Sequence, residues 1–215
     1  MVEIIAVDGP AGSGKSSVSK QVARELGFGY LDTGAAYRAL AWATSHGFVV
    51  NLQGDPEQAL KAFEYSISLN PDAFWVKVGD VDVTAAIREP EIAETVSSVA
   101  GIPVVRNFMK QLTRDLVAGS GLPGVVVEGR DITTVVAPDA KNRILLTASE
   151  EVRLRRRSAE LAPEAAKNVE RQVSQRDAQD AKVVDFLTPA PGVKLVDSTE
   201  LNFEQTVSAV LDAVR

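Results

Sequence analysis

The sequence predicts an α/β fold in which a doubly wound parallel sheet carries an inserted subdomain and a helical lid. Three observations support this prediction. A nearly continuous apolar run at residues 2–7, typical of a buried parallel strand, leads through a glycine-rich loop into a helical pattern. Further apolar runs alternate with helical patterns along most of the chain. Between about residues 54 and 101, short strands and turn signals interrupt this alternation.

The N-terminal half alternates strands with helices before it changes to short antiparallel strands. Apolar residues at helical spacing predict helices that start at Ser16 and after Asp32, with a short strand at 28–31 between them. The inserted stretch begins with a short helix at 56–64 and continues with three small strands, at 65–69, 74–78 and 81–83. We therefore expect a core of residues 1–53, 102–149 and 184–215, an insertion at about 54–101, and a lid at about 150–183.

The C-terminal half returns to longer elements. Helical spacing covers residues 92–99 and 105–116, and apolar runs predict strands at 125–127, 144–146 and 193–196. Thr147-Ala148-Ser149 provides an N-cap for an arginine-rich helix. Residues 150–182 are polar and helical with little apolar stripe, which suits a lid better than a core, and an amphipathic helix at 203–214 ends the fold.

Composition limits the classes of partner. With 215 residues, 45% of them hydrophobic, the chain can bury a full core, and one domain is expected. Its net charge of −6 argues against broad attraction to nucleic acid or anionic lipid. No apolar run approaches the ~20 residues of a membrane span, and the acidic, strand-like N-terminus does not resemble a leader peptide. The absence of cysteine excludes disulfides and thiolate metal sites and fits a reducing interior. We expect a cytoplasmic monomer that binds neither nucleic acid nor membrane.

Residues 9–16 read GPAGSGKS, the Gly-x-x-x-x-Gly-Lys-Ser pattern of a loop that binds a nucleoside triphosphate. Its glycines let consecutive N–H groups face the phosphates, and the positive end of the following helix adds to the attraction. Lys15 can reach the β- and γ-phosphates, and the Ser16 hydroxyl can ligate Mg²⁺. The residues expected to bind ATP are Gly9, Pro10, Ala11, Gly12, Ser13, Gly14, Lys15, Ser16 and Ser17.

Polar residues follow four of the predicted strands. Because the carboxyl ends of parallel strands meet at one edge of a sheet, these groups should form one rim around a ligand. They are the GPAGSGKS loop, Asp32-Thr33-Gly34, Glu128-Gly129-Arg130-Asp131 and Asp197-Ser198-Thr199. The sole histidine, His46, stands at a predicted helix end, where it should cap the helix or be exposed. We therefore do not expect a histidine to act as general base. Neither Asp-x-x-Gly nor Asn-Lys-x-Asp occurs, which disfavours a GTPase switch.

The arginines indicate a phosphorylated acceptor. Four of them fall within residues 153–157 of a chain that is acidic overall. A phosphate monoester has a second pKa of about 6 and is already an oxyanion near neutral pH. Phosphoryl transfer to it therefore requires cations that offset repulsion rather than a general base. Lys15, Arg38, Arg130 and the lid arginines are suited to this task, since arginine binds phosphate oxygens bidentately.

The motifs GPAGSGKSS, LDTGAAYR, VVVEGRDI, RLRRR and RDAQD, in this order and spacing, resemble those of the bacterial cytidylate (CMP/dCMP) kinases, a family of P-loop nucleoside monophosphate kinases. The resemblance covers essentially the whole chain. It implies a P-loop fold whose insertion binds a nucleoside monophosphate (NMP) and whose lid closes over both substrates. The implied reaction moves the γ-phosphoryl group of ATP, bound with Mg²⁺, to CMP or dCMP.

The resemblance also implies roles for individual residues. Arg38 and Arg130 would hold the phosphate of CMP, and Arg156 and Arg157 would close over the transferring phosphoryl group. The implied catalytic residues are Lys15, Arg38, Arg130, Arg156 and Arg157. Thr33, Arg106 and Asp131 would read the cytosine, Arg176 and Asp180 would reach the ribose, and Tyr37 would pack beside the pyrimidine. The implied substrate-binding residues are Thr33, Tyr37, Arg38, Arg106, Glu128, Arg130, Asp131, Arg176 and Asp180.

Two departures from the family pattern occur. Val183 stands where the lid commonly has an arginine, and Glu128 stands where aspartate is frequent. The second Mg²⁺ ligand stays open among Asp32, Glu128 and water. Two other functions also stay open: a kinase for a hydroxyl-bearing metabolite such as shikimate, with Asp32 as general base, and a nucleotide-gated binding module whose lid recruits a partner.

Overall fold

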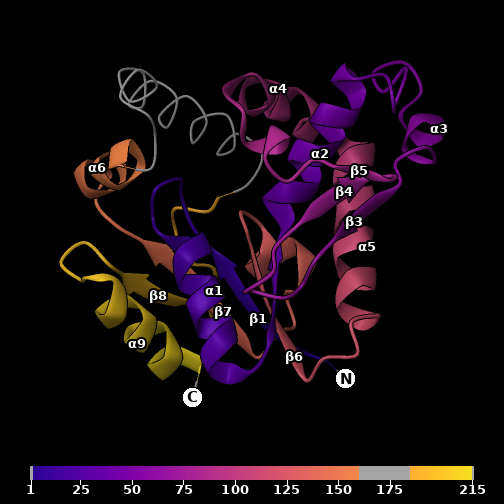
Figure 1. Ribbon diagram of the computed structural model, residues 1–215. Coiled ribbons are helices and arrows are strands. Elements are labelled where there is room, and N and C mark those ends of the chain that lie inside the picture. The colour runs from indigo at the N-terminus through magenta and orange to yellow at the C-terminus, as the bar shows by residue number, and fades with distance from the viewer. Residues whose placement is uncertain (1, 160–184, 215) are drawn as a thin grey trace. The chain divides into compact units, whose positions relative to one another are not determined.

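The computed structural model describes residues 2–159 and 185–214 (Figure 1). Its main sheet consists of β1 (Glu3–Asp8), β2 (Gly29–Asp32), β6 (Gly124–Gly129), β7 (Asn142–Thr147) and β8 (Lys194–Asp197). The strand order is β2-β6-β1-β7-β8, and the β1–β6, β1–β7 and β7–β8 pairs are parallel. Both the strand positions and the parallel pairing confirm the predicted α/β fold class.

The chain divides into two compact units. The first comprises Met1–Tyr30 and Leu122–Arg215, and the second comprises Leu31–Gly121. The predicted insertion at 54–101 falls within the second unit, and its exact limits stay a prediction.

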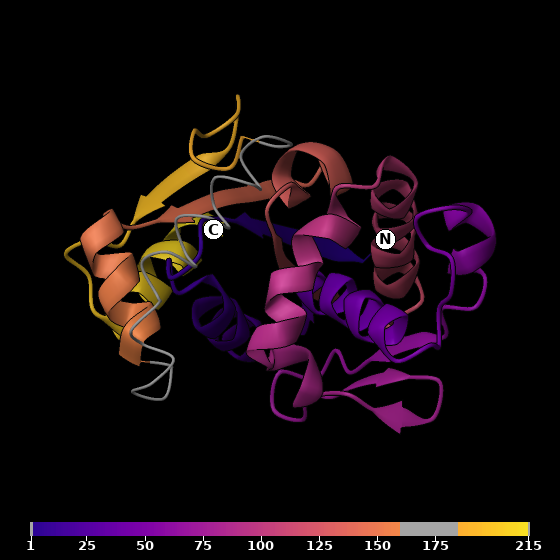
Figure 2. The same cartoon turned by 90° about the horizontal axis from the view of Figure 1, so that it is seen from above.

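In the first unit, α1 (Lys15–Leu26) and α9 (Phe203–Val214) contact each other and lie on the same face of the sheet (Figures 1 and 2). Each turns an apolar stripe inward, as Val22 and Val210, both without exposed surface, illustrate. The arginine-rich helix α6 (Glu150–Ala159) begins as predicted, because the Ser149 hydroxyl accepts a hydrogen bond from the Val152 N–H at 3.4 Å.

The second unit is built around α2 (Thr33–Ser45), which packs against α4 (Pro90–Ala100), α5 (Pro103–Ala118) and the 3₁₀ turn η1 (Ala86–Arg88). The predicted small strands are present as an antiparallel sheet of β3 (Tyr65–Ile67), β4 (Val76–Val78) and β5 (Val81–Asp82). The predicted helix at 56–64 is too long: α3 ends at Leu60, because residues 61–63 continue with i→i+3 bonds.

The structure also bears on the predictions for His46, the lid and membrane-spanning helices. His46 caps the C-terminus of α2, as expected, and its ring stacks on Trp42 with centroids 4.3 Å apart. Of the predicted lid at 150–183, the structure describes α6, whereas Arg176 and Asp180 lie outside the described residues. Within the described ranges, every helix is too short or too polar to cross a lipid bilayer.

Two leucines on neighbouring strands differ in burial, and we therefore expect them to differ in their contribution to stability. Leu146 has no exposed surface on β7, whereas Leu195 on the neighbouring β8 is 53% exposed. Leu146→Ala should therefore lower the free energy of unfolding by about 2–5 kcal/mol, and the matched control Leu195→Ala by less than about 1 kcal/mol. Urea unfolding measures both, and equal losses would contradict the assignment of β7 to the core.

Candidate active site

The phosphate loop joins β1 to α1 and depends on glycine for its shape. Gly12 and Gly14 have φ angles of 75° and 85°, in the left-handed region that other residues rarely adopt. A Cβ at Gly12 would also lie 2.4 Å from the backbone oxygen of Arg153 on α6. Helix α6 therefore packs directly against the loop, and glycine alone fits between them.

Side chains of α6 and α1 bind the loop through its carbonyl oxygens. Arg153 donates to the Ala11 oxygen at 2.9 Å, and Arg156 donates to the Ser13 oxygen at 3.3 Å. The ammonium of Lys15 donates to the oxygen of Pro10 at 3.4 Å. These bonds place cationic groups beside the loop without using its N–H donors, which are the groups expected to bind phosphate.

Asp8, the last residue of β1, is the main site residue that the sequence analysis missed. Its carboxylate is 2% exposed and accepts three hydrogen bonds: from the Ile132 N–H at 2.9 Å, the Thr133 N–H at 2.8 Å and the Thr133 hydroxyl at 2.6 Å. Burial raises the pKa of Asp8, and the bonds from Thr133 and Ile132 and the charge of Lys15 offset part of this rise. An aspartate directly before the first glycine of the loop was the available sequence signal.

Arg130 follows the end of β6 and reaches back to the same loop. Its Nη1 donates to the carbonyl oxygen of Gly9, the first residue of the loop. The next residue, Asp131, precedes the π-helical turn η2 (Ile132–Val136), and its carbonyl accepts from the Val135 N–H at 2.8 Å. The structure thus brings the phosphate loop and the Arg130-Asp131 segment together, as the shared edge of the strands predicts.

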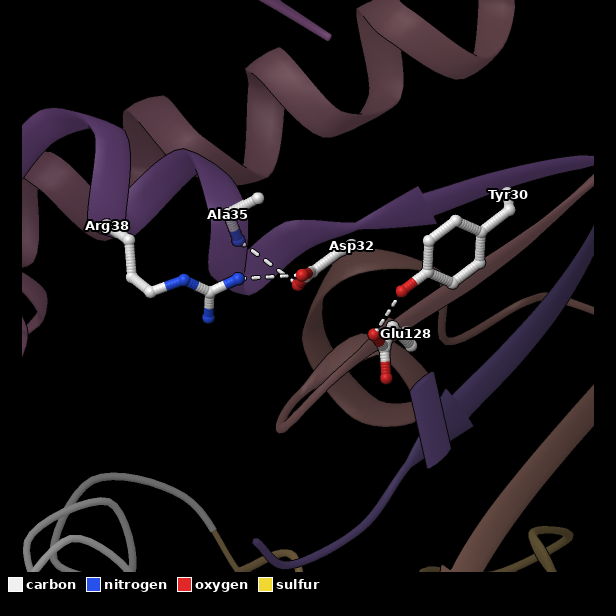
Figure 3. Close-up of polar contacts among 5 residues, drawn as sticks. All are labelled: Tyr30, Asp32, Ala35, Arg38 and Glu128. Atoms are coloured by element: carbon white, nitrogen blue, oxygen red, sulfur yellow. Dashed lines mark hydrogen bonds and ion pairs between the residues drawn. The ribbon is translucent and has the colours of Figure 1, made fainter. Parts of the chain in front are cut away.

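Glu128 is buried in β6, where it is 1% exposed. The phenol of Tyr30, on β2, donates to its Oε1 at 2.5 Å (Figure 3). The ammonium of Lys20 lies 5.2 Å from the centroid of the Tyr30 ring. Tyr30 therefore fixes the longer carboxylate that stands at this position, a contact that the sequence pattern did not reveal.

In the second unit, Arg38 and Asp32 form an ion pair at the start of α2 (Figure 3). The Nη2 of Arg38 lies 2.7 Å from the Oδ2 of Asp32, while the Oδ1 caps the helix by accepting from the Ala35 N–H at 3.1 Å. Both oxygens of Asp32 thus have donors. In this structure Asp32 thus serves as a helix cap and as the ion-pair partner of Arg38.

The other predicted residues of the second unit lie on two helices that contact each other. Thr33 begins α2 and is buried, and Tyr37 lies one turn further along, next to Arg38. Arg106 lies on the first turn of α5, which packs against α2.

The two lid arginines that were expected at the transferring group, Arg156 and Arg157, both lie on α6 and are half-exposed. Arg156 donates to the Ser198 hydroxyl and carbonyl, both at 2.9 Å, and to the Leu201 carbonyl at 3.2 Å. Burial and the neighbouring Arg155 lower its pKa. Arg156 thus links α6 to the residues that follow β8.

Ser16 is the residue that the sequence predicts as a Mg²⁺ ligand. Ser16 is exposed at the first turn of α1, next to Lys15. Among the described residues, no group of three or more acidic, histidine or cysteine side chains could hold a metal ion. The Ser16 hydroxyl is the group in the loop that could ligate Mg²⁺.

Known proteins resemble this chain along its whole length. The cytidylate kinase family profile matches residues 5–215. A cytidylate kinase from Cutibacterium acnes is 42% identical over 217 residues, which cover 98% of this chain and 95% of that protein. A cytidylate kinase from Desulfitobacterium hafniense is 43% identical over 213 residues, with 96% and 90% covered.

Among solved structures, an uncharacterized protein from Eubacterium ventriosum shares the fold. Its TM-score is 0.50 at 10% sequence identity, and the match covers 99% of this chain and 98% of that one.

The buried Asp8 generates a pH prediction. Because burial raises its pKa above the ordinary value of 3.8, the folded protein holds this proton more tightly than the unfolded chain does. As the pH rises above 3.8, the unfolded carboxyl ionises first, and ionisation favours unfolding. The stability of the native protein relative to the Asp8→Asn variant should therefore fall as the pH rises through the folded pKa. Urea unfolding of both proteins measures this difference, and an increase with pH would contradict the dominance of burial.

Proposed function

Because this chain belongs to the cytidylate kinase family, we infer that it transfers the γ-phosphoryl group of ATP to CMP or dCMP. The products are ADP and CDP or dCDP. One new P–O bond forms at an oxygen of the acceptor phosphate while the bond between the β- and γ-phosphates breaks. The acceptor oxygen carries negative charge near neutral pH, so no side chain has to remove a proton.

In this proposal, ATP binds to residues 9–17. The glycine geometry described above supports this, because the left-handed Gly12 and Gly14 turn the backbone as a phosphate loop requires. Lys15 neutralises the β- and γ-phosphates, and Ser16 holds the Mg²⁺ that the nucleotide brings. The metal ion supplies charge neutralisation at the phosphate oxygens.

Arginines hold the phosphate of the acceptor in this proposal. Arg38 and Arg130 bind its oxygens, and Arg156 and Arg157 stabilise the transferring group. The observation that carries the proposal is the bond from Arg130 to the Gly9 carbonyl, since it anchors a cation at the first residue of the phosphate loop.

Cytosine is proposed to be read by Thr33, Arg106 and Asp131. A carboxylate accepts from the exocyclic amine of cytosine, and an arginine donates to its ring acceptors. The remaining proposed contacts are Tyr37 beside the pyrimidine, Glu128 in support of Arg130, and Arg176 and Asp180 at the ribose.

We also propose that the protein is a monomer that works in the cytoplasm and binds neither nucleic acid nor membrane. The acidic, cysteine-free composition agrees with this proposal.

Acceptor profiling tests the reaction. With ATP and Mg²⁺, ADP formation should be fastest with CMP or dCMP and slow with UMP, AMP and shikimate. Uracil has a carbonyl where cytosine has its amine, so Asp131→Asn should reduce the preference for CMP over UMP by about tenfold or more. ATP turnover that no acceptor stimulates would favour the nucleotide-gated binding module, and an unchanged CMP preference in the variant would remove Asp131 from the base site.

The phosphate role of Arg130 makes a separate prediction. Arg130→Ala should lower kcat/KM for CMP by roughly 10²–10³-fold, because a cation that acts on the transition state is lost. The Kd for ATP, measured by calorimetry, should change by less than about twofold. Arg24→Ala, at an exposed arginine of α1 bonded to Gln21, is the matched control and should leave both constants unchanged. Unaltered CMP kinetics in Arg130→Ala would exclude this role.

A further inference from the structure

Phe186 combines deep burial with a contact to a charged group. It follows Asp185 in the described stretch that leads to β8, and its ring is 1% exposed. The guanidinium carbon of Arg130 lies 4.6 Å from the ring centroid, within the range of a cation–π interaction. Arg130 is half-buried, so less water competes for its guanidinium than at an exposed site, which strengthens a cation–π interaction.

The backbone around Phe186 is fixed by its neighbour. The carboxylate of Asp185 accepts from the N–H groups of Leu187 and Thr188, each at 3.0 Å. Leu187 is 54% exposed, so the turn directs Phe186 inward between two exposed residues. The position of the ring thus results from a local turn as well as from packing.

The partners of Arg130 include a carbonyl and an aromatic ring. Its Nη1 donates to the Gly9 carbonyl, and its guanidinium lies over the Phe186 ring. A ring restricts the arginine without neutralising its charge, unlike the carboxylate that pairs with Arg38. An arginine that a ring holds in one orientation loses less side-chain entropy when a phosphate binds.

We propose that Phe186 is a positioning residue that holds the Arg130 guanidinium, through a cation–π interaction, in the orientation that binds the acceptor phosphate. This inference rests on the proposed phosphate role of Arg130. Phe186 itself does not touch the substrate in this account. It acts on the acceptor through Arg130, so binding of ATP is independent of it.

Fluorinated phenylalanines at position 186 test the interaction. Each added fluorine withdraws electron density from the ring and weakens its attraction for a cation, while ring shape changes little. Across phenylalanine and its mono-, di- and trifluoro forms, kcat/KM for CMP should fall stepwise, by about tenfold in total. KM for ATP should stay constant. Phe186→Leu, which keeps an apolar side chain but has no ring, should lose at least as much as the trifluoro form.

Two controls separate the possible outcomes. The same fluorinated series at Phe203, an exposed residue of α9, should not change the kinetics. Suppose that Arg130→Ala loses activity toward CMP but kcat/KM stays constant across the fluorinated forms of Phe186. This result would overturn the positioning role of Phe186 and leave the role of Arg130 intact. If Arg130→Ala keeps its CMP kinetics, the proposed role of Arg130 fails first. A purely structural role for Phe186 predicts changes in thermal stability without a graded change in kcat/KM.

Discussion

The buried carboxylate of Asp8 is the constraint on which the geometry of the first unit depends. Asp8 ends the central strand, where it pairs in register with Gly129 of β6 and Leu145 of β7. Burying a carboxylate is costly unless hydrogen bonds satisfy it, and three donors from the 132–133 turn do so. The phosphate loop begins one residue after Asp8, and Arg130-Asp131 lie directly before that turn. One side chain therefore fixes two functional segments relative to each other.

The arginines of the first unit and Arg38 of the second unit have different kinds of partner, and the kind of partner has electrostatic consequences. Arg153 and Arg156 donate to backbone carbonyls, which orient a guanidinium and leave its charge intact. Arg130 has a carbonyl and an aromatic ring. Arg38 forms an ion pair with the carboxylate of Asp32. The proposed ligands are anions, and an arginine anchored by a neutral group keeps more positive charge for such a ligand than one paired with a carboxylate.

Local patterns in the sequence predict the fold well and the contacts of the site poorly. The phosphate loop, the apolar strands and the Ser149 cap depend on neighbouring residues, so their positions could be read directly. The partners of Asp8 and Glu128 are 125 and 98 residues away, and no pattern in a single sequence joins such pairs. For the same reason, the contact of Phe186 with the distant Arg130 could not be predicted from the sequence. This reason also applies to Arg156, whose bonds to Ser198 could not be foreseen.

The Asp32–Arg38 ion pair has a consequence for the choice of ligand. An anion that binds Arg38 has to compete with a carboxylate already 2.7 Å away. A doubly charged phosphate can displace this carboxylate from Arg38, because it carries more negative charge and has three acceptor oxygens instead of two. An uncharged nucleoside has no negative group that could replace the carboxylate. Under the proposed role of Arg38, the ion pair therefore favours binding of phosphorylated compounds over their dephosphorylated precursors.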